Sequence, residues 1–298
     1  MKVWTPSHPS RPAVTHLALT AVQRLTGLEP FPQPPVIPLR LPVVLMHGFG
    51  LLAVIRRKGH LHDTAMHLRA HGVRAYAPNV APYETIATRA AMWAERIRHV
   101  LAETGAPQVH LVAHSMGGLD ARYLISRLDF HPYVASLTTI ATPHRGTAIA
   151  DVVLQQPERL RDWAAEIVDW LGANALADGT SNVRQAVHEL TPAYVEGTFN
   201  PNTPDHPDVR YASYGGQAGK GTSTPINPFL KPLNVLLYHR QGINDGYVPV
   251  SSAQWGTYRG TLEADHLRQI GIQMGSGGSF DAGAFFASLV RHLAAEGG

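Results

Sequence analysis

The amino-acid sequence predicts an α/β protein with a mostly parallel central sheet and helices on both faces. Apolar runs of strand length alternate with longer helical patterns between residues 41 and 141, which is typical of a doubly wound sheet. One apolar run, residues 109–112, leads directly into a tight turn and the start of a helix. Because ligands bind at the carboxyl ends of parallel strands, we expect the functional site where these strands end.

The composition is that of a large globular chain. Its length of 298 residues is enough for one large α/β domain or two small ones. The residues are 44% hydrophobic and only 16% charged. A net charge of +3 without a run of Lys or Arg makes nucleic acid a poor candidate for a partner. The sequence has no cysteine, which excludes disulfides, thiolate metal sites and cysteine nucleophiles.

The N-terminal residues 1–40 are expected to form an arm that packs on the body, and residues 41–298 the main domain. No apolar run approaches the ~20 residues of a membrane span, so we expect no transmembrane span. Prolines at 6, 9 and 12 interrupt the region where the apolar core of a signal peptide would lie. This pattern predicts a cytoplasmic rather than a secreted protein.

The expected elements follow from apolar periodicity and from Gly and Pro punctuation. Strands are expected over residues 41–46, 74–78, 109–112, 136–141 and 209–214. Helices are expected over residues 61–71, 85–103, from the turn after 112 to about 128, and 282–294. Residues 227–240 fit a helix or a strand equally well.

Ser115 lies in the tight turn between the strand at 109–112 and the following helix. Ala113 stands two residues before it and Gly117 two residues after it, which is the pattern of a nucleophile elbow with alanine in the first glycine place. Small flanking residues are needed because the strand and helix backbones cross closely there. The backbone N–H of Met116 is then placed to face a developing oxyanion.

The His47-Gly48-Phe49-Gly50 segment directly follows the first predicted strand. A His-Gly pair at this point can supply a second oxyanion donor, the backbone N–H of Phe49, because the glycines let the loop double back. We expect His47 to be structural and to hold this loop by hydrogen bonds.

A serine hydroxyl becomes a nucleophile when a histidine removes its proton and a carboxylate sets the tautomer of that histidine. After an elbow serine, the acid and the histidine follow in that chain order. His266 is the preferred base because it falls late, in a polar segment before the last helix. Asp245, in an Asn-Asp-Gly turn, is the preferred acid.

Other residues are weaker candidates for these roles. Asp265 is adjacent to His266 and would point away from it in an extended loop. His144 lies in a turn and precedes any plausible acid. Asp120 falls inside the helix after the serine, where we expect a structural partner for Arg122 or another neighbour.

Residues 147–205 interrupt the alternation of strands and helices and contain an amphipathic helical pattern over 160–171. Two interpretations remain open, a helix packed on the core and a lid over the serine. In the second, the residues expected to contact an apolar substrate are Trp163, Ile167, Trp170 and Leu171.

Several motifs together resemble the bacterial true lipases, the triacylglycerol lipase group that includes the Pseudomonas and Burkholderia enzymes. The similar segments are His47-Gly48-Phe49, residues 109–123, residues 138–146, Asn244-Asp245-Gly246-Tyr247-Val248 and Asp265-His266-Leu267. The resemblance implies the α/β-hydrolase fold with a helical lid or cap insertion. It also implies Ser115 as nucleophile, Asp245 as acid and His266 as base, which agrees with the choice made from chain order.

The family's structural calcium site is where the sequence departs most from the resemblance. Arg268 stands two residues after the histidine, where the family has a calcium-binding aspartate, and Lys231 aligns with a second one. Cations repel calcium, so we expect no calcium, no other metal and no cofactor. An ion pair with a local acid would substitute.

These observations predict a serine ester hydrolase, a lipase or carboxylesterase, that cleaves apolar acyl esters, at a lipid–water interface if it is a lipase. The alternatives are an acyltransferase or thioesterase with the same triad, and a non-catalytic lipid-binding homologue. The sequence leaves the oligomeric state, the acyl chain length and the physiological substrate open.

Overall fold

The computed structural model describes residues 34–49, 61–155, 181–272 and 280–297, and the statements below concern these ranges. They contain a six-stranded sheet with the order β2-β1-β3-β4-β5-β6, and every neighbouring pair of strands is parallel. The strands are β1 (Val43–Met46), β2 (Ala75–Tyr76), β3 (Val109–His114), β4 (Val134–Ile140), β5 (Arg210–Gly216) and β6 (Thr257–Leu262).

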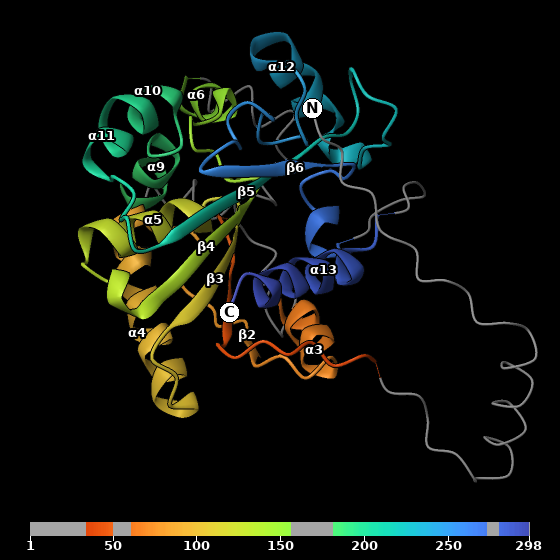
Figure 1. Cartoon of the computed structure of the whole chain (residues 1–298). Coiled ribbons are helices and arrows are strands. Elements are labelled where there is room, and N and C mark those ends of the chain that lie inside the picture. The colour runs from red at the N-terminus through yellow and green to blue at the C-terminus, as the bar shows by residue number, and fades with distance from the viewer. Residues whose placement is uncertain (1–33, 50–60, 156–180, 273–279, 298) are drawn as a thin grey trace, which may run out of the picture.

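Helices cover both faces of this sheet. In Figure 1, α4 (Ile86–Thr104) and α5 (Gly117–Arg127) lie on one face, and α3 (His62–Ala70) and α13 (Ala282–Ala295) lie on the other. The remaining longer helices are α6 (Ala148–Gln155), α9 (Ser181–His188) and α12 (Lys231–Gln241). The short helical elements are α10 (Pro192–Tyr194), α11 (Asn200–Asn202), the π-helical turn η2 (Val195–Phe199), and the 3₁₀ turns η1 (His131–Tyr133), η3 (Pro228–Leu230) and η4 (Arg268–Ile270).

The pleat of the strands creates two separate apolar cores. In β1, Val43 and Leu45 belong to the core on the α3–α13 side, whereas Val44 and Met46 belong to the core on the α4–α5 side. This alternation explains why the central strands read as continuous apolar runs, because both faces of a parallel sheet are buried.

The predicted helix boundaries agree with the structure because local capping signals set them. Thr85 caps α4, and its side chain accepts a hydrogen bond from the Thr88 N–H at 3.3 Å. Gly105 ends this helix with a positive φ of 64°. Asp281 caps α13 by accepting a hydrogen bond from the Ala284 N–H at 2.9 Å.

Two elements differ from the sequence-based expectations. The strand β6 was not predicted, because its sequence Thr-Tyr-Arg-Gly-Thr-Leu contains neither an apolar run nor a strict alternation. The ambiguous segment 227–240 is helical, forming η3 and then α12. Pro228 and Pro232 fall in the first turn of these helices, where proline is well tolerated.

The expected arm and insertion are described only in part. Residues 34–40 contain no helix or strand, and the Ile37 N–H donates to the His71 carbonyl. Of the insertion 147–205, the structure describes α6 and the segment from α9 to α11. The amphipathic pattern at 160–171, including Trp163, Ile167, Trp170 and Leu171, lies outside the described residues.

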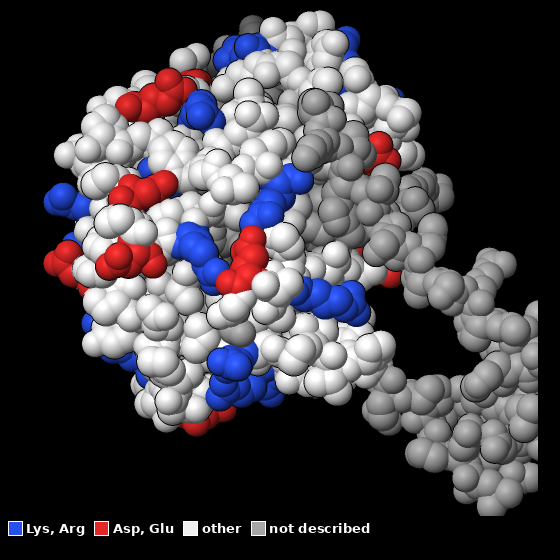
Figure 2. Space-filling model, in the orientation of Figure 1, with Lys and Arg blue, Asp and Glu red and all other residues white. Residues whose placement is uncertain are grey.

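Charges of both signs are interspersed on the face of the molecule shown in Figure 2. Within the described ranges, no helix is both long enough and apolar enough to cross a membrane.

Candidate active site

Ser115 lies in the sharp turn between β3 and α5, with a positive φ of 58°. Residues other than glycine rarely adopt this backbone conformation, so the surrounding structure must hold Ser115 in it. The Ser115 N–H donates to the Ile140 carbonyl at 2.9 Å, and the Thr142 hydroxyl donates to the Ser115 carbonyl at 2.7 Å. The predicted nucleophile-elbow geometry is therefore present and is anchored to β4 and the turn after it.

The small residues around Ser115 are required by close backbone approach. A Cβ added to Gly117 would lie 2.8 Å from the His47 carbonyl oxygen, and one added to Gly118 would lie 2.1 Å from the Thr142 hydroxyl. Ala113 is fully buried and fits at the remaining position. A larger side chain at Gly117 would push α5 away from the loop after β1, and one at Gly118 would collide with Thr142 in the turn after β4.

Asp245 and His266 form a buried hydrogen-bonded pair. His266 Nδ1 lies 2.7 Å from Asp245 Oδ2, and the His266 backbone N–H donates to the Asp245 carbonyl at 2.9 Å. The other carboxylate oxygen, Oδ1, accepts hydrogen bonds from the N–H groups of Tyr247 at 3.0 Å and Val248 at 2.8 Å. With Nδ1 donating to the carboxylate, Nε2 of His266 is left to accept a proton.

The imidazole of His266 lies beside the elbow. Its ring centre is 4.4 Å from that of His114, the residue immediately before Ser115, and 5.2 Å from that of Tyr247. The structure thus brings together two of the predicted triad residues directly, and places the base against the residue that precedes the third.

Asp265 accepts hydrogen bonds from backbone N–H groups and is not the partner of the His266 imidazole. Its Oδ1 accepts hydrogen bonds from the Leu267 and Arg268 N–H groups, and its Oδ2 accepts one from the Asn227 N–H at 3.1 Å. Asp265 therefore holds the turn that carries His266 and does not contact the imidazole as Asp245 does.

The Gly48 backbone lies directly over Ser115. A Cβ at Gly48 would be 2.6 Å from Ser115 Cβ, 2.9 Å from its Oγ and 3.0 Å from the Met116 nitrogen. The Gly48 carbonyl accepts from Arg89 Nη2 at 3.2 Å. In a trans peptide unit the C=O and N–H point in opposite directions, so the Phe49 N–H points away from the Arg89 guanidinium.

Arg89, which sequence reasoning missed, holds the loop that carries Phe49. Its Nη2 also donates to the His47 carbonyl at 2.8 Å, and its Nη1 donates to the Ala81 carbonyl at 2.7 Å. The guanidinium forms a fully buried ion pair with Asp120 at 2.9 Å. The sequence signal was present, because Arg89 is the one charged residue on the buried stripe of α4.

Asp120 pairs with Arg89 and not with Arg122, which corrects the first partner proposed for it. Trp93 Nε1 also donates to Asp120 Oδ2, at 3.2 Å. Burial raises the pKa of Asp120 to about 6, and the Arg89 guanidinium opposes this shift. Arg122 instead donates to Asn200 at 2.8 Å and lies over the Trp255 ring at 3.7 Å.

The remaining two histidines of interest are structural. His47 Nδ1 donates to the Gly48 carbonyl at 2.9 Å, and its Nε2 accepts from the Val80 N–H at 3.2 Å, so it holds the loop after β1 by hydrogen bonds. His144 is fully buried, and its Nε2 lies 3.0 Å from Thr139 Oγ1. Burial, and then the Arg122 charge, keep the pKa of His144 well below its usual range, which makes it a poor base.

The residues at the expected calcium position do not fit that ion. Arg268 is buried, lies 4.0 Å from Asp265 and donates to the Pro225 carbonyl at 3.4 Å. Lys231 is exposed at the start of α12. Arg268 and Asp265 are therefore an ion pair within this turn. Within the described residues, no group of three or more His, Asp or Glu side chains could hold a metal ion.

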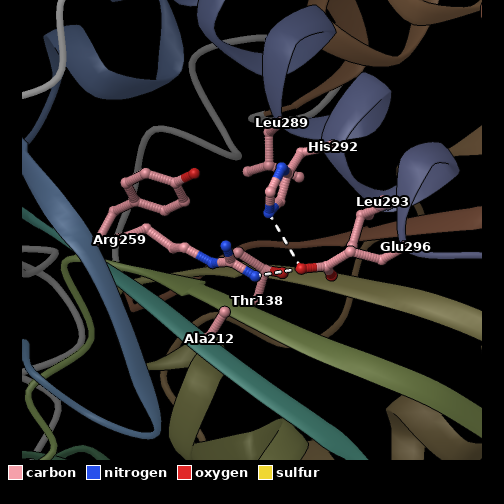
Figure 3. A pocket seen from close by; sticks show the side chains of 8 residues that line it. Thr138, Ala212, Arg259, Leu289, His292, Leu293 and Glu296 are labelled. Atoms are coloured by element: carbon pink, nitrogen blue, oxygen red, sulfur yellow. Dashed lines mark hydrogen bonds and ion pairs between the residues drawn. The ribbon is translucent and has the colours of Figure 1, made fainter.

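A small hollow between α13 and the sheet is separate from the triad (Figure 3). In Figure 3, Arg259 extends from β6 towards Glu296, the residue that follows α13, and His292 Nε2 approaches the same carboxylate at 3.0 Å. The lining residues are Thr138, Ala212, Tyr214, Arg259, Leu289, His292, Leu293 and Glu296. These side chains fasten the end of α13 to β6 and include no nucleophile–base pair.

A serine on a strand–turn–helix elbow, with a buried His–Asp pair beside it, defines the α/β-hydrolase class of proteins. Residues 42–193 match the family described as alpha/beta hydrolase fold, and the chain belongs to this family.

Among its relatives, triacylglycerol lipase 2 of Saccharomyces cerevisiae is 35% identical over 207 residues, which cover 67% of this chain and 58% of the yeast protein. A Vibrio cholerae triacylglycerol lipase is 27% identical over 263 residues, covering 79% of this chain and 81% of the relative. This chain therefore spans less than two thirds of the length of the yeast relative. The predicted resemblance to lipases is confirmed.

The structure of lipase 1 from Pelosinus fermentans has the same fold. It superimposes with a TM-score of 0.66 at 19% identity, and covers 85% of this chain and 98% of that one.

Proposed function

We propose that this chain is a serine ester hydrolase, a lipase or carboxylesterase, that cleaves apolar acyl esters through an acyl-enzyme. The observation that carries the proposal is the 2.7 Å hydrogen bond between His266 and Asp245, in a pair that packs against His114 beside the elbow of Ser115. The lipase relatives support the same class of substrate.

In the first half of the reaction, Ser115 Oγ attacks the ester carbonyl carbon while His266 Nε2 takes the hydroxyl proton. The carbonyl oxygen becomes an oxyanion that accepts hydrogen bonds from the Phe49 and Met116 N–H groups. The C–O bond then breaks, and His266 gives its proton to the leaving alcohol. Asp245 stabilises the imidazolium that forms between these two transfers.

In the second half, water takes the place of the alcohol. His266 removes a proton from the water as it attacks the acyl-enzyme, and returns the proton to Ser115 Oγ when the acid leaves. No metal or organic cofactor takes part in either half of this scheme.

The test is hydrolysis of p-nitrophenyl esters with short and long acyl chains by the wild type and by Ser115→Ala. We expect the wild type to hydrolyse them and the variant to lose at least about a thousandfold in kcat, because the nucleophile is gone. Unchanged hydrolysis by the variant would contradict the proposal. Faster cleavage of matched thioesters, or transfer to added alcohols in preference to water, would favour a thioesterase or an acyltransferase.

A further inference from the structure

Gln269 is fully buried. Its side chain makes hydrogen bonds to Asp245 and to His114, whose ring packs against His266. Gln269 lies in η4, three residues after His266. Its Nε2 lies 2.9 Å from Asp245 Oδ2, the same oxygen that contacts His266, and 3.3 Å from the Ala264 carbonyl. Its Oε1 lies 3.2 Å from Nε2 of His114.

The partners fix which way the Gln269 amide points. Asp245 Oδ2 can only accept when the carboxylate is ionised, so the NH₂ group must face it. The amide oxygen then faces His114, which must donate from its Nε2. A single neutral side chain thus links the acid to the residue that precedes the elbow serine.

The end of β5 leaves space for this amide. A Cβ added to Gly216 would lie 1.9 Å from Gln269 Nε2, so any other residue there would displace the side chain. Its hydrogen bonds to Asp245, Ala264 and His114 then oppose rotation of the amide.

We propose that Gln269 is a positioning residue for the reaction proposed above, and this inference rests on that function. Its NH₂ group holds Asp245 Oδ2 towards His266 Nδ1. Its oxygen holds His114 as the Nε2–H form, with its ring against the ring of His266. One side chain that itself transfers no proton therefore orients two neighbours of the base, the acid at its Nδ1 and the ring of His114.

Asp245 is buried, and its carboxylate has four hydrogen-bond partners. Two come from backbone N–H groups that cannot leave, and two go to Oδ2, from His266 and Gln269. Without the amide, Oδ2 is free to turn out of line with the imidazole, and His114 loses the acceptor for its Nε2–H.

The test compares Gln269→Leu with Gln217→Leu, a matched control. Gln217 is also buried, at the end of β5, but its Oε1 has no hydrogen-bond partner among the described residues. We expect Gln269→Leu to lower kcat for p-nitrophenyl ester hydrolysis by about tenfold to a hundredfold, with KM within about twofold of wild type. Gln217→Leu should leave both near wild type.

A third variant, Gln269→Glu, keeps the shape but donates to Asp245 only when protonated. The titratable groups that face this side chain are Asp245 and His114, with His266 and Tyr247 packed beside them. We expect the ratio of its kcat to that of wild type to fall as pH rises. A purely structural role would give a ratio that is independent of pH.

Two outcomes would overturn the inference: a kcat within twofold of wild type for Gln269→Leu, or an equal loss in Gln217→Leu. An independent readout is the downfield proton resonance of the His266 Nδ1–H, assigned with His266→Ala. Gln269→Leu should shift or broaden it and Gln217→Leu should not. If the wild type hydrolyses no ester, the proposed function fails, and this resonance alone decides the role of Gln269.

Discussion

Among single residues, Arg89 connects the buried Asp120 carboxylate to the loop that carries Phe49. Its guanidinium donates hydrogen bonds to the carbonyls of His47 and Gly48. The peptide unit that carries the Phe49 N–H therefore has a fixed orientation. A buried arginine is costly unless it is paired, and Asp120 supplies the opposite charge at 2.9 Å. The pair therefore holds the peptide unit of Phe49, which the proposed mechanism uses as an oxyanion donor.

The prediction for Arg89→Lys is a loss of at least about tenfold in kcat for ester hydrolysis, with the fold retained. Lysine keeps the charge opposite Asp120 but lacks the planar group that holds two carbonyls at once, and a misplaced oxyanion donor raises the barrier. Arg122→Lys is the matched control, because Arg122 is equally buried but contacts Asn200 and Trp255. Equal losses in the two variants would contradict this role.

His110 makes stability depend on pH. It is fully buried, with Nδ1 2.8 Å from the Ser136 hydroxyl and without a partner for Nε2 in the described residues. Burial, and then the Arg210 charge, lower its pKa from 6.5 to about 4. Between these two values the unfolded chain binds a proton that the folded chain does not, so stability falls as pH decreases through this window.

We therefore expect His110 to cost roughly 3 kcal/mol of unfolding free energy between pH 7 and pH 4. Urea denaturation at a series of pH values measures this cost, with His110→Gln as the comparison. The variant should show a smaller loss of stability over that range. If the variant showed the same pH dependence as the wild type, His110 would not be the cause of the loss of stability.

Among the elements, α4 contacts both the loop after β1 and the segment after α9. The Glu189 carboxylate accepts a hydrogen bond from the Ile86 N–H, at the first turn of α4, at 2.6 Å. A carboxylate at this position also interacts favourably with the helix dipole. Arg89 lies in the same turn of the helix, so one turn of α4 contacts both the loop after β1 and the inserted segment.

The turn after β6 is held by charge pairing within the chain. Arg268 approaches Asp265 at 4.0 Å, and Asp265 also accepts backbone N–H groups from both sides. A guanidinium at this point opposes binding of a divalent cation. The loop that carries His266 is therefore held by contacts within the chain.

We predict that neither EDTA nor added calcium changes the melting temperature or the rate of ester hydrolysis. Thermal unfolding followed by circular dichroism, with EDTA alone and with EDTA plus excess calcium, measures the effect. A fall in Tm with EDTA that calcium reverses would show that other ligands, outside this turn, hold the ion.

For the whole molecule, the parallel order of the sheet brings distant parts of the chain to one edge. The loop after β1, the elbow after β3, the loop after α12 and the turn after β6 supply Phe49, Ser115, Asp245 and His266. Their spacing in the sequence is large, but parallel strands end at the same edge, which is where such sheets bind ligands.

Much of this arrangement could be predicted from the sequence because its signals are local. The elbow depends on small residues around Ser115, and chain order alone selected Asp245 and His266. The residues that were missed act over long separations: Arg89 reaches a loop 41 residues away, and Gln269 reaches Asp245 across 24 residues. Neither belongs to a motif, so their partners became visible only with the fold.

The proposed function requires Ser115 to be a nucleophile that His266 and Asp245 activate. The most direct measurement is labelling of the wild type with a fluorophosphonate, followed by mass spectrometry of the modified peptide. We predict one label per chain, on Ser115, and a strong decrease in labelling rate in His266→Ala. Labelling of another residue, or equal rates in the wild type and His266→Ala, would contradict the account.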